Sequence, residues 1–194
     1  MTKKHLEKIV SLLYEAGSLR KISRAHRQFL LTNDLSDNTA SHSYRTTIIG
    51  YFLAQLEKAD VNKVIKICLF HDFEESRSGD QNWLNKRYIK KFDEDIINDQ
   101  FKCPPVFTEI INNIFEYSQR ITLESKIAKD ADILDELLLL REYELQGNKE
   151  ACRWLIHQEK GLITVSAKKI AEEIKTQDPH KWWWSHWTPH CRKN

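Results

Sequence analysis

Glycine and proline are scarce in this chain of 194 residues, which contains five glycines and four prolines. A β-sandwich or barrel needs many tight turns, so this composition disfavours both and favours an all-α protein. Long apolar runs are missing as well, since the stretches 48–54 and 137–140 are far shorter than the ~20 residues that span a bilayer. Because the first residues also lack the pattern of an export signal, we expect a cytoplasmic protein that does not bind membranes.

Cysteine and net charge are also low. The 30 basic and 28 acidic side chains give a net charge of +2, which does not indicate a dedicated nucleic-acid-binding or membrane-binding protein. Residues 1–31 are more basic than the rest, so an anionic ligand could bind there. The four cysteines form no Cys-x-x-Cys pair, which disfavours a zinc knuckle and is typical of reduced thiols. They are Cys68, Cys103, Cys152 and Cys191.

The chain does have enough apolar sequence to form one core. Hydrophobic residues make up 41% and charged residues 30%, which excludes the composition of a disordered protein. The length predicts one domain, and apolar residues recur at helical spacing, so we expect a helical bundle over residues 1–176. The tail, 177–194, is rich in tryptophan, and exposing so much aromatic surface is unfavourable. We therefore expect the tail to pack on the domain or on a partner subunit.

The hydrophobic pattern also predicts where the helices lie. Two short helices should open the chain, separated at Gly17, and the next helix should be capped by Thr39 or Ser41. Thr122 is expected to precede a long helix that Gly147 closes. Further helices are predicted over 61–75, 83–98, 149–158 and 162–175, and after the prolines at 104–105.

Two histidines and two aspartates could form a metal site between helices of this bundle. Two imidazoles and two carboxylates would hold a divalent ion and leave positions open for a phosphate oxygen and a water. Taken singly, each residue has an ordinary structural explanation, such as a hydrogen-bonded histidine or a solvated aspartate. The apolar neighbours of each polar group favour the site. The four residues are His42, the adjacent pair His71 and Asp72, and Asp132, all on predicted helices.

The order of these residues resembles the HD superfamily of metal-dependent phosphohydrolases, which are helical bundles. The sequence is most similar to the short HD proteins that include the bacterial 5′-deoxynucleotidases. The resemblance covers most of 19–147 and is best over 71–80, His-Asp-Phe-Glu-Glu-Ser-Arg-Ser-Gly-Asp. It implies one divalent ion, either Mn, Co, Fe, Ni, Zn or Mg, and it implies the ligands His42, His71, Asp72 and Asp132.

The same resemblance makes Glu75 the catalytic carboxylate. Glu75 lies three positions after Asp72, so both side chains should project from one helical face. Close to a cation, this carboxylate could accept a proton from water or deliver one to the leaving oxygen. Its neighbour Glu74 should point elsewhere, and we expect it to be a surface acid.

An arginine before the first histidine of the motif contacts the phosphate in the proteins that this sequence resembles. The pattern assigns that role to Arg24, and a guanidinium offers a planar, bidentate match to phosphate. Asp80 would contact the sugar or the leaving group, and Lys86 could help to stabilise the phosphate. Members that prefer deoxyribose usually carry a tryptophan close after the arginine. Residues 25–26 here are alanine and histidine, so the sugar preference stays open.

The expected reaction is removal of the 5′-phosphate from (deoxy)nucleoside monophosphates by metal-activated water. No histidine lies between Asp72 and Asp132, where cyclic-nucleotide phosphodiesterases of the superfamily recruit histidines for a second metal. A small-molecule nucleotide is the expected substrate, and a homodimer or higher homo-oligomer is the expected assembly. A deoxynucleoside triphosphate hydrolase on the same scaffold is an alternative. A non-enzymatic module that binds single-stranded nucleic acid through the tryptophan-rich tail is less favoured.

Overall fold

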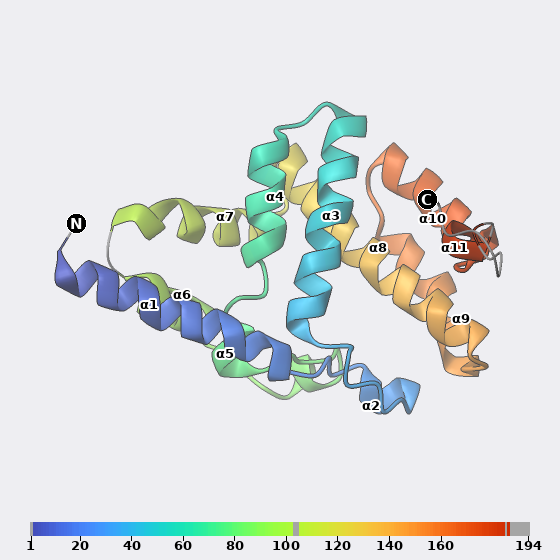
Figure 1. The fold of residues 1–194 in the computed structure, drawn as a ribbon, viewed down its shortest axis with the longest axis horizontal. Helices are drawn as coiled ribbons and strands as arrows, with labels where there is room; N and C mark the ends of the chain where they lie inside the picture. The colour runs from blue at the N-terminus through green and yellow to red at the C-terminus, as the bar shows by residue number, and fades with distance from the viewer. Residues whose placement is uncertain (1, 103–104, 185, 187–194) are drawn as a thin grey trace, which may run out of the picture.

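The computed structural model describes residues 2–102, 105–184 and 186 and confirms an all-α fold (Figure 1). These residues form helices, turns and one isolated bridge, between Ser23 and Asn38. The α-helices are α1 (Lys3–Ser18), α2 (Arg27–Leu30), α3 (Thr39–Glu57), α4 (Val61–Phe70), α5 (Glu75–Ser78), α6 (Asp93–Phe101), α7 (Thr108–Gln119), α8 (Leu123–Leu145), α9 (Lys149–Gln158), α10 (Val165–Thr176) and α11 (Lys181–Trp184). Short 3₁₀ turns cover Leu19–Lys21, Asn85–Arg87, Pro105–Phe107 and Glu159–Gly161.

Helices α3, α4 and α8 form the centre of the molecule, and α9 and α10 pack against α8 (Figure 1). Their shared core includes Leu53, Ile67 and Leu134, which are fully buried. Burying each such side chain stabilises the fold by about 1.5–3 kcal/mol. A Cβ atom at Gly50 would lie 2.6 Å from Cys68 Sγ, so glycine allows α3 and α4 to approach closely at this point.

A second apolar cluster lies where side chains of α1, α6 and α7 meet (Figure 1). Its buried members include Leu12, Phe73, Phe101 and Ile114. Phe73 directly follows the His-Asp pair, while Cys68, just before that pair, belongs to the central core. The segment that carries the pair is therefore held between the two clusters.

The helix expected over 61–75 is confirmed over 61–70 and was wrong beyond Phe70. Helix α4 ends at Phe70, and residues 71–74 form turns before α5 begins at Glu75. Burial of Phe73 in the second cluster requires the chain to leave the helical path here. The helix expected over 83–98 is confirmed only from residue 93, where α6 begins. Before it, the Asn82 side chain accepts hydrogen bonds from Leu84 N–H and Asn85 N–H and starts a 3₁₀ turn instead.

The N-terminal boundaries also differ from the sequence predictions. Helix α1 continues through Gly17 to Ser18, and only the 3₁₀ turn and the short α2 follow it. The N-cap of α3 is Asn38, whose side chain accepts a hydrogen bond from Ser41 N–H at 3.0 Å, rather than Thr39 or Ser41. The long helix expected after Thr122 is confirmed, and the Thr122 side chain caps it by accepting a hydrogen bond from Ser125 N–H.

The described part of the tail exposes two of its aromatic side chains. Trp182 is 77% exposed and Trp184 is 62% exposed, so neither is buried against the domain. Packing of the tail on a partner subunit stays a prediction, and residues 187–194 lie outside the described residues. Cys68 and Cys152 are free thiols, whereas Cys103 and Cys191 lie outside the described residues. Among the described helices, none combines the length and the apolar character that a membrane span requires.

Candidate active site

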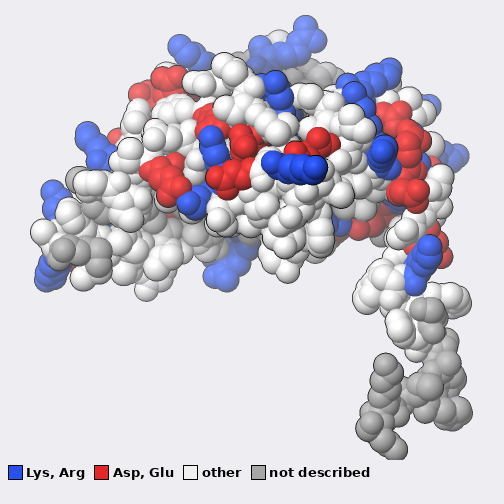
Figure 2. Space-filling view, turned by 90° about the horizontal axis from the view of Figure 1, so that it is seen from above, with Lys and Arg blue, Asp and Glu red and all other residues white. Residues whose placement is uncertain are grey.

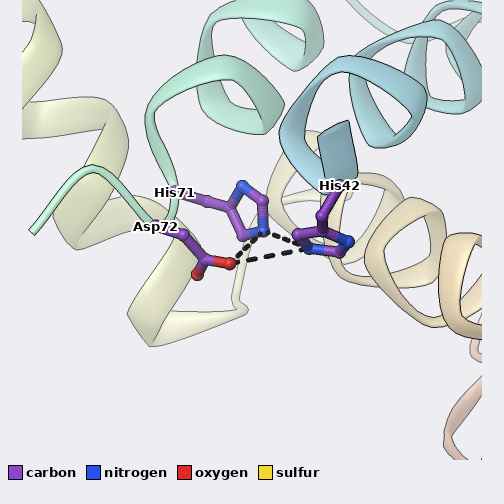
Figure 3. A group of neighbouring side chains, drawn as sticks. All are labelled: His42, His71 and Asp72. Atoms are coloured by element: carbon purple, nitrogen blue, oxygen red, sulfur yellow. Dashed lines mark hydrogen bonds and ion pairs between the residues drawn. The ribbon is translucent and has the colours of Figure 1, made fainter. Parts of the chain in front are cut away.

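Two buried imidazoles meet at the centre of the bundle. His42 lies in the first turn of α3, and His71 is the C-cap residue directly after α4. Their Nε2 atoms are 3.2 Å apart. Asp72 Oδ2 is 3.2 Å from His71 Nε2 and 3.5 Å from His42 Nε2, and Figure 3 shows the three side chains pointing toward one another. These three ligand atoms lie within 4.8 Å of one another, which is close enough to bind one ion.

The second nitrogen of each ring is held by a hydrogen bond that orients the imidazole. His71 Nδ1 donates to the Cys68 carbonyl oxygen at 2.8 Å, and His42 Nδ1 donates to Asp135 Oδ2 at 2.6 Å. With the Nδ1 atoms donating these hydrogen bonds, both Nε2 atoms face the shared point. This tautomer and this orientation are the ones that metal-binding histidines use, so the donor set fits a divalent ion.

Asp132 reaches the same point from α8. Its Oδ1 atom is 3.2 Å from His42 Nε2, while its Oδ2 atom accepts hydrogen bonds from Tyr117 Oη at 2.7 Å and Lys129 Nζ at 2.6 Å. The structure therefore groups three of the four residues that the sequence singles out as ligands, and it places the fourth, Asp132, against His42. They do not all lie on helices as expected, because His71 and Asp72 lie in the turn that follows α4.

The charges around this point favour a cation. Burial and the nearby Arg24 would lower the pKa of His42, but the carboxylates of Asp132 and Asp135 raise it to about 9. Burial would raise the pKa of Asp72, but His71, His42 and Arg24 hold it below its ordinary value. The carboxylates thus stay ionised, and positive charge next to them is stabilised.

Arg24 and Asp80 lie beside the four residues. Arg24 Nη1 donates to Asp72 Oδ2 at 3.2 Å, and Arg24 Nε is 3.7 Å from Asp80 Oδ2. Asp80 Oδ2 also accepts a hydrogen bond from Ala25 N–H at 2.6 Å. Asp80 therefore fixes both the backbone after Arg24 and the direction of its guanidinium.

Glu75 is buried at the start of α5. It is 4% exposed, and its Oε2 atom accepts a hydrogen bond from the Thr39 hydroxyl at 3.1 Å. Burial, together with the charges of Asp72 and Asp80, raises the pKa of Glu75 to about 9. The raised pKa favours the protonated form of this carboxyl, which can act as a proton donor.

The expectation that Glu74 is a surface acid was wrong. Glu74 is half-buried and lines the cleft described next, because residues 71–74 form turns rather than a helix. Burial, reinforced by Asp72, raises the pKa of Glu74 to about 8. Its Oε2 atom is buried without a hydrogen-bond partner within the described part of the chain.

A cleft of about 880 Å³ opens over these residues. Arg24, Asp72, Glu75, Asp80 and Asp132 all line it, and so does Lys86, whose side chain is exposed. Further along α8 the lining continues with Glu136, and α9 contributes Trp154 and Gln158. The cleft thus joins the candidate metal ligands to a region that is partly aromatic.

The sequence model of the HD domain family matches residues 16–176, which is most of the chain. The chain belongs to the HD domain family. The match includes α3, the turn after α4 and α8, which carry the four candidate ligands of this HD domain.

Individual proteins similar to this HD domain come from yeast, archaea and bacteria. The 5′-deoxynucleotidase YGK1 of Saccharomyces cerevisiae is 26% identical over 162 residues, which cover 77% of this chain and 68% of the yeast protein. A conserved hypothetical protein from Pyrococcus furiosus has a solved structure with 28% identity and a TM-score of 0.70, covering 87% of this chain and 99% of that one. A predicted metal-dependent phosphohydrolase from Magnetospirillum magnetotacticum MS-1, at 20% identity and a TM-score of 0.67, covers 89% of this chain and 94% of its own, and shows the fold alone.

Several residues that support the HD site were missed from the sequence. Asp135 binds His42 Nδ1 and also pairs with Arg45, while Tyr117 and Lys129 hold Asp132. The only sequence signal was helical spacing, since Lys129 and Asp135 each lie three positions from Asp132 and Arg45 lies three positions from His42. Such spacing is common on any helix and does not by itself indicate a site.

Replacing Asp135 with asparagine should weaken metal binding by about ten- to a hundredfold. Asparagine keeps the shape of the side chain and one acceptor oxygen, but it loses the charge that orients His42 and makes its ring more basic. Competition with a metal-binding dye measures the affinity.

Glu142→Gln provides a matched control, because Glu142 Oε1 accepts from Arg45 Nη1 at 2.7 Å and belongs to the same ion-pair network without touching His42. It should bind metal as the wild type does. Equal affinities for Asp135→Asn and the wild type would show that Asp135 does not support the site.

Proposed function

We propose that this HD domain is a metal-dependent phosphohydrolase that removes the 5′-phosphate from nucleoside or deoxynucleoside monophosphates. The observation that carries the proposal is the convergence of two imidazoles and two carboxylates beside a guanidinium, since Arg24 Nη1 lies 3.2 Å from Asp72 Oδ2. The name of the yeast relative, a 5′-deoxynucleotidase, supports the choice of substrate.

His42, His71, Asp72 and Asp132 would hold one divalent ion. When bound, such an ion supplies Lewis-acid chemistry, which polarises a phosphate oxygen and lowers the pKa of a water molecule. The two histidines contribute neutral donors and the two aspartates contribute charge, a mixed set that suits several divalent metals.

The remaining residues act on the phosphate and on the leaving group. Arg24 is held by Asp72 and Asp80 with its planar fork at the cleft, where it would bind two phosphate oxygens and stabilise their charge during the reaction. Lys86 lines the same cleft and adds positive charge. A water oxygen forms the new bond to phosphorus as the bond to the 5′ oxygen breaks. The proton on Glu75 passes to that leaving oxygen, and a proton from the attacking water restores the Glu75 carboxyl.

The test is metal analysis of the purified protein followed by phosphate release from ribo- and deoxynucleoside mono- and triphosphates. We expect one bound divalent ion per chain and inorganic phosphate from the monophosphates. Failure of the metal-loaded protein to release phosphate from any 5′-monophosphate would overturn the proposal.

A nucleoside triphosphate hydrolase is the second candidate. Four more basic side chains line the cleft besides Arg24, and they could neutralise additional phosphates; they are Lys86, Lys91, Arg120 and Lys129. Ion chromatography distinguishes the two functions, because release of triphosphate or pyrophosphate would favour this candidate.

Nucleic-acid binding remains the least favoured function. Figure 2 shows Lys and Arg side chains intermixed with Asp and Glu over the face seen from above, whereas a nucleic-acid groove concentrates positive charge.

The homodimer also stays a prediction.

Replacing Arg24 with lysine should lower kcat/KM for a nucleoside monophosphate by about a hundredfold, since lysine cannot form the bidentate contact with phosphate. The loss should appear at saturating metal concentration, and the fold should be unchanged. Steady-state kinetics of phosphate release measures it. Arg77→Lys is the matched control, because Arg77 pairs with Glu15 on the surface. Wild-type kcat/KM in Arg24→Lys would remove Arg24 from phosphate binding.

A further inference from the structure

We infer that Trp83 and Trp154 form a stacking site for the nucleobase, so that the cleft selects nucleotides over sugar phosphates that lack a base. This inference rests on the proposed function and assigns a part of the cleft that the reaction at phosphorus does not use. Both tryptophans line the cleft, and both contact the same aromatic ring, that of Phe29 in α2.

Trp83 presents an aromatic surface to the cleft. One face of its ring stacks on Phe29, with ring centroids 5.4 Å apart and planes inclined by 26°. The side chain is nevertheless 58% exposed and belongs to neither apolar cluster of the protein. An indole in this position contributes little to the core, but it offers a rigid flat surface to a planar ligand.

Trp154 provides the second aromatic surface from α9. Its ring centroid is 6.2 Å from that of Phe29, with the planes inclined by 45°. It is half-buried and packs partly against the central core, so its position is better fixed than that of Trp83. Phe29 thus holds two indoles, from segments far apart in the sequence, on the same cleft.

Trp154 lies about two helical turns from the candidate metal ligand Asp132, one turn along α8 and one along α9. Glu136 follows Asp132 by four residues on α8, a rise of ~6 Å. Gln158 Nε2 donates to Glu136 Oε1 at 2.9 Å, and Gln158 itself lies one turn after Trp154 on α9. With the phosphate at Asp132, the leaving group must extend along the cleft, and a base joined through a pentose would reach the aromatic region.

Glu136 and Gln158 give this region a polar edge. The glutamine amide and the glutamate carboxyl together retain donor and acceptor capacity beyond their mutual hydrogen bond. Both line the cleft beside Trp154. Aromatic faces combined with such an edge match a nucleobase, which has a flat π-surface and hydrogen-bonding groups around its rim, and do not match a bare pentose phosphate.

Two measurements on the metal-loaded full chain test the inference. The first is calorimetric binding of deoxyadenosine, a nucleoside without phosphate, and the second is kcat/KM for deoxyadenosine 5′-monophosphate and for 2-deoxyribose 5-phosphate. Trp83→Ala and Trp154→Ala should each weaken deoxyadenosine binding about tenfold, within the about five- to hundredfold range of a lost base stack. The same variants should lower kcat/KM for the nucleotide by a similar factor and leave kcat/KM for the sugar phosphate within about twofold.

Conservative variants and a control separate stacking from folding. Trp154→Phe should recover most of the deoxyadenosine affinity, because phenylalanine keeps an aromatic face, and Trp182→Ala, in the exposed tail, should change nothing. Absence of deoxyadenosine binding to the wild type, or equal losses for the nucleotide and the sugar phosphate, would overturn the inference. By contrast, deoxyadenosine binding without phosphate release from any monophosphate would overturn the proposed function and leave the stacking site standing.

Discussion

Replacement of His71 with alanine is expected to abolish stable binding of a divalent ion and to lower phosphate release about a thousandfold or more. His71 Nε2 lies 3.2 Å from both His42 Nε2 and Asp72 Oδ2. Removing the imidazole therefore removes the nitrogen ligand that lies next to both of these residues. A water molecule in place of the imidazole would offer the ion an oxygen ligand instead of a neutral nitrogen ligand that the protein holds in position. Metal content of the purified variant and phosphate release at saturating metal measure the two losses.

His71 is 3% exposed, so the alanine variant must be compared with one that preserves packing. Asp72→Asn keeps the shape of its side chain and should also lose most of the bound metal, because a neutral amide is a much poorer ligand. His157→Ala, on the exposed side of α9, serves as the histidine control. Folded His71→Ala protein that retains metal and activity would show that the four residues do not form the catalytic metal site.

The sequence was sufficient to predict the bundle because helical periodicity is strong in long segments. The long helix after Thr122 and the helix over 149–158 agree with the structure, since each depends on residues close in sequence. The turns at 71–74 could not be predicted in this way. They depend on burial of Phe73 against Phe101, a contact that local spacing does not encode.

The same distinction applies to the site. The four candidate ligands could be selected because the order of His and Asp follows a known pattern. The structure groups three of them and places Asp132 against His42. The network that orients these ligands could not be predicted from the sequence, because Asp135 contacts His42 across 93 positions of the chain. No local sequence pattern predicted the aromatic contacts in the cleft either. Only the fold brings the Phe29 ring against Trp83 and Trp154.

Replacement of Glu75 with glutamine should lower the rate of nucleotide hydrolysis by about a hundred- to ten-thousandfold while the metal stays bound. Glutamine preserves the hydrogen bond that the Thr39 hydroxyl donates, because its carbonyl oxygen can accept it, but it cannot deliver a proton to the leaving oxygen. Steady-state phosphate release and metal analysis on the same sample measure both properties. Glu94→Gln, an exposed change on α6, is the control.

The leaving group then reveals which proton Glu75 transfers. The p-nitrophenolate ion is a weak base that departs without protonation, so p-nitrophenyl phosphate should lose much less rate in Glu75→Gln than a nucleoside monophosphate does. Equal losses for the two substrates would instead assign Glu75 to the attacking water, because that step is common to both. Full activity toward the nucleotide would remove Glu75 from the chemistry altogether, and the buried carboxyl beside Thr39 would then have a structural role only.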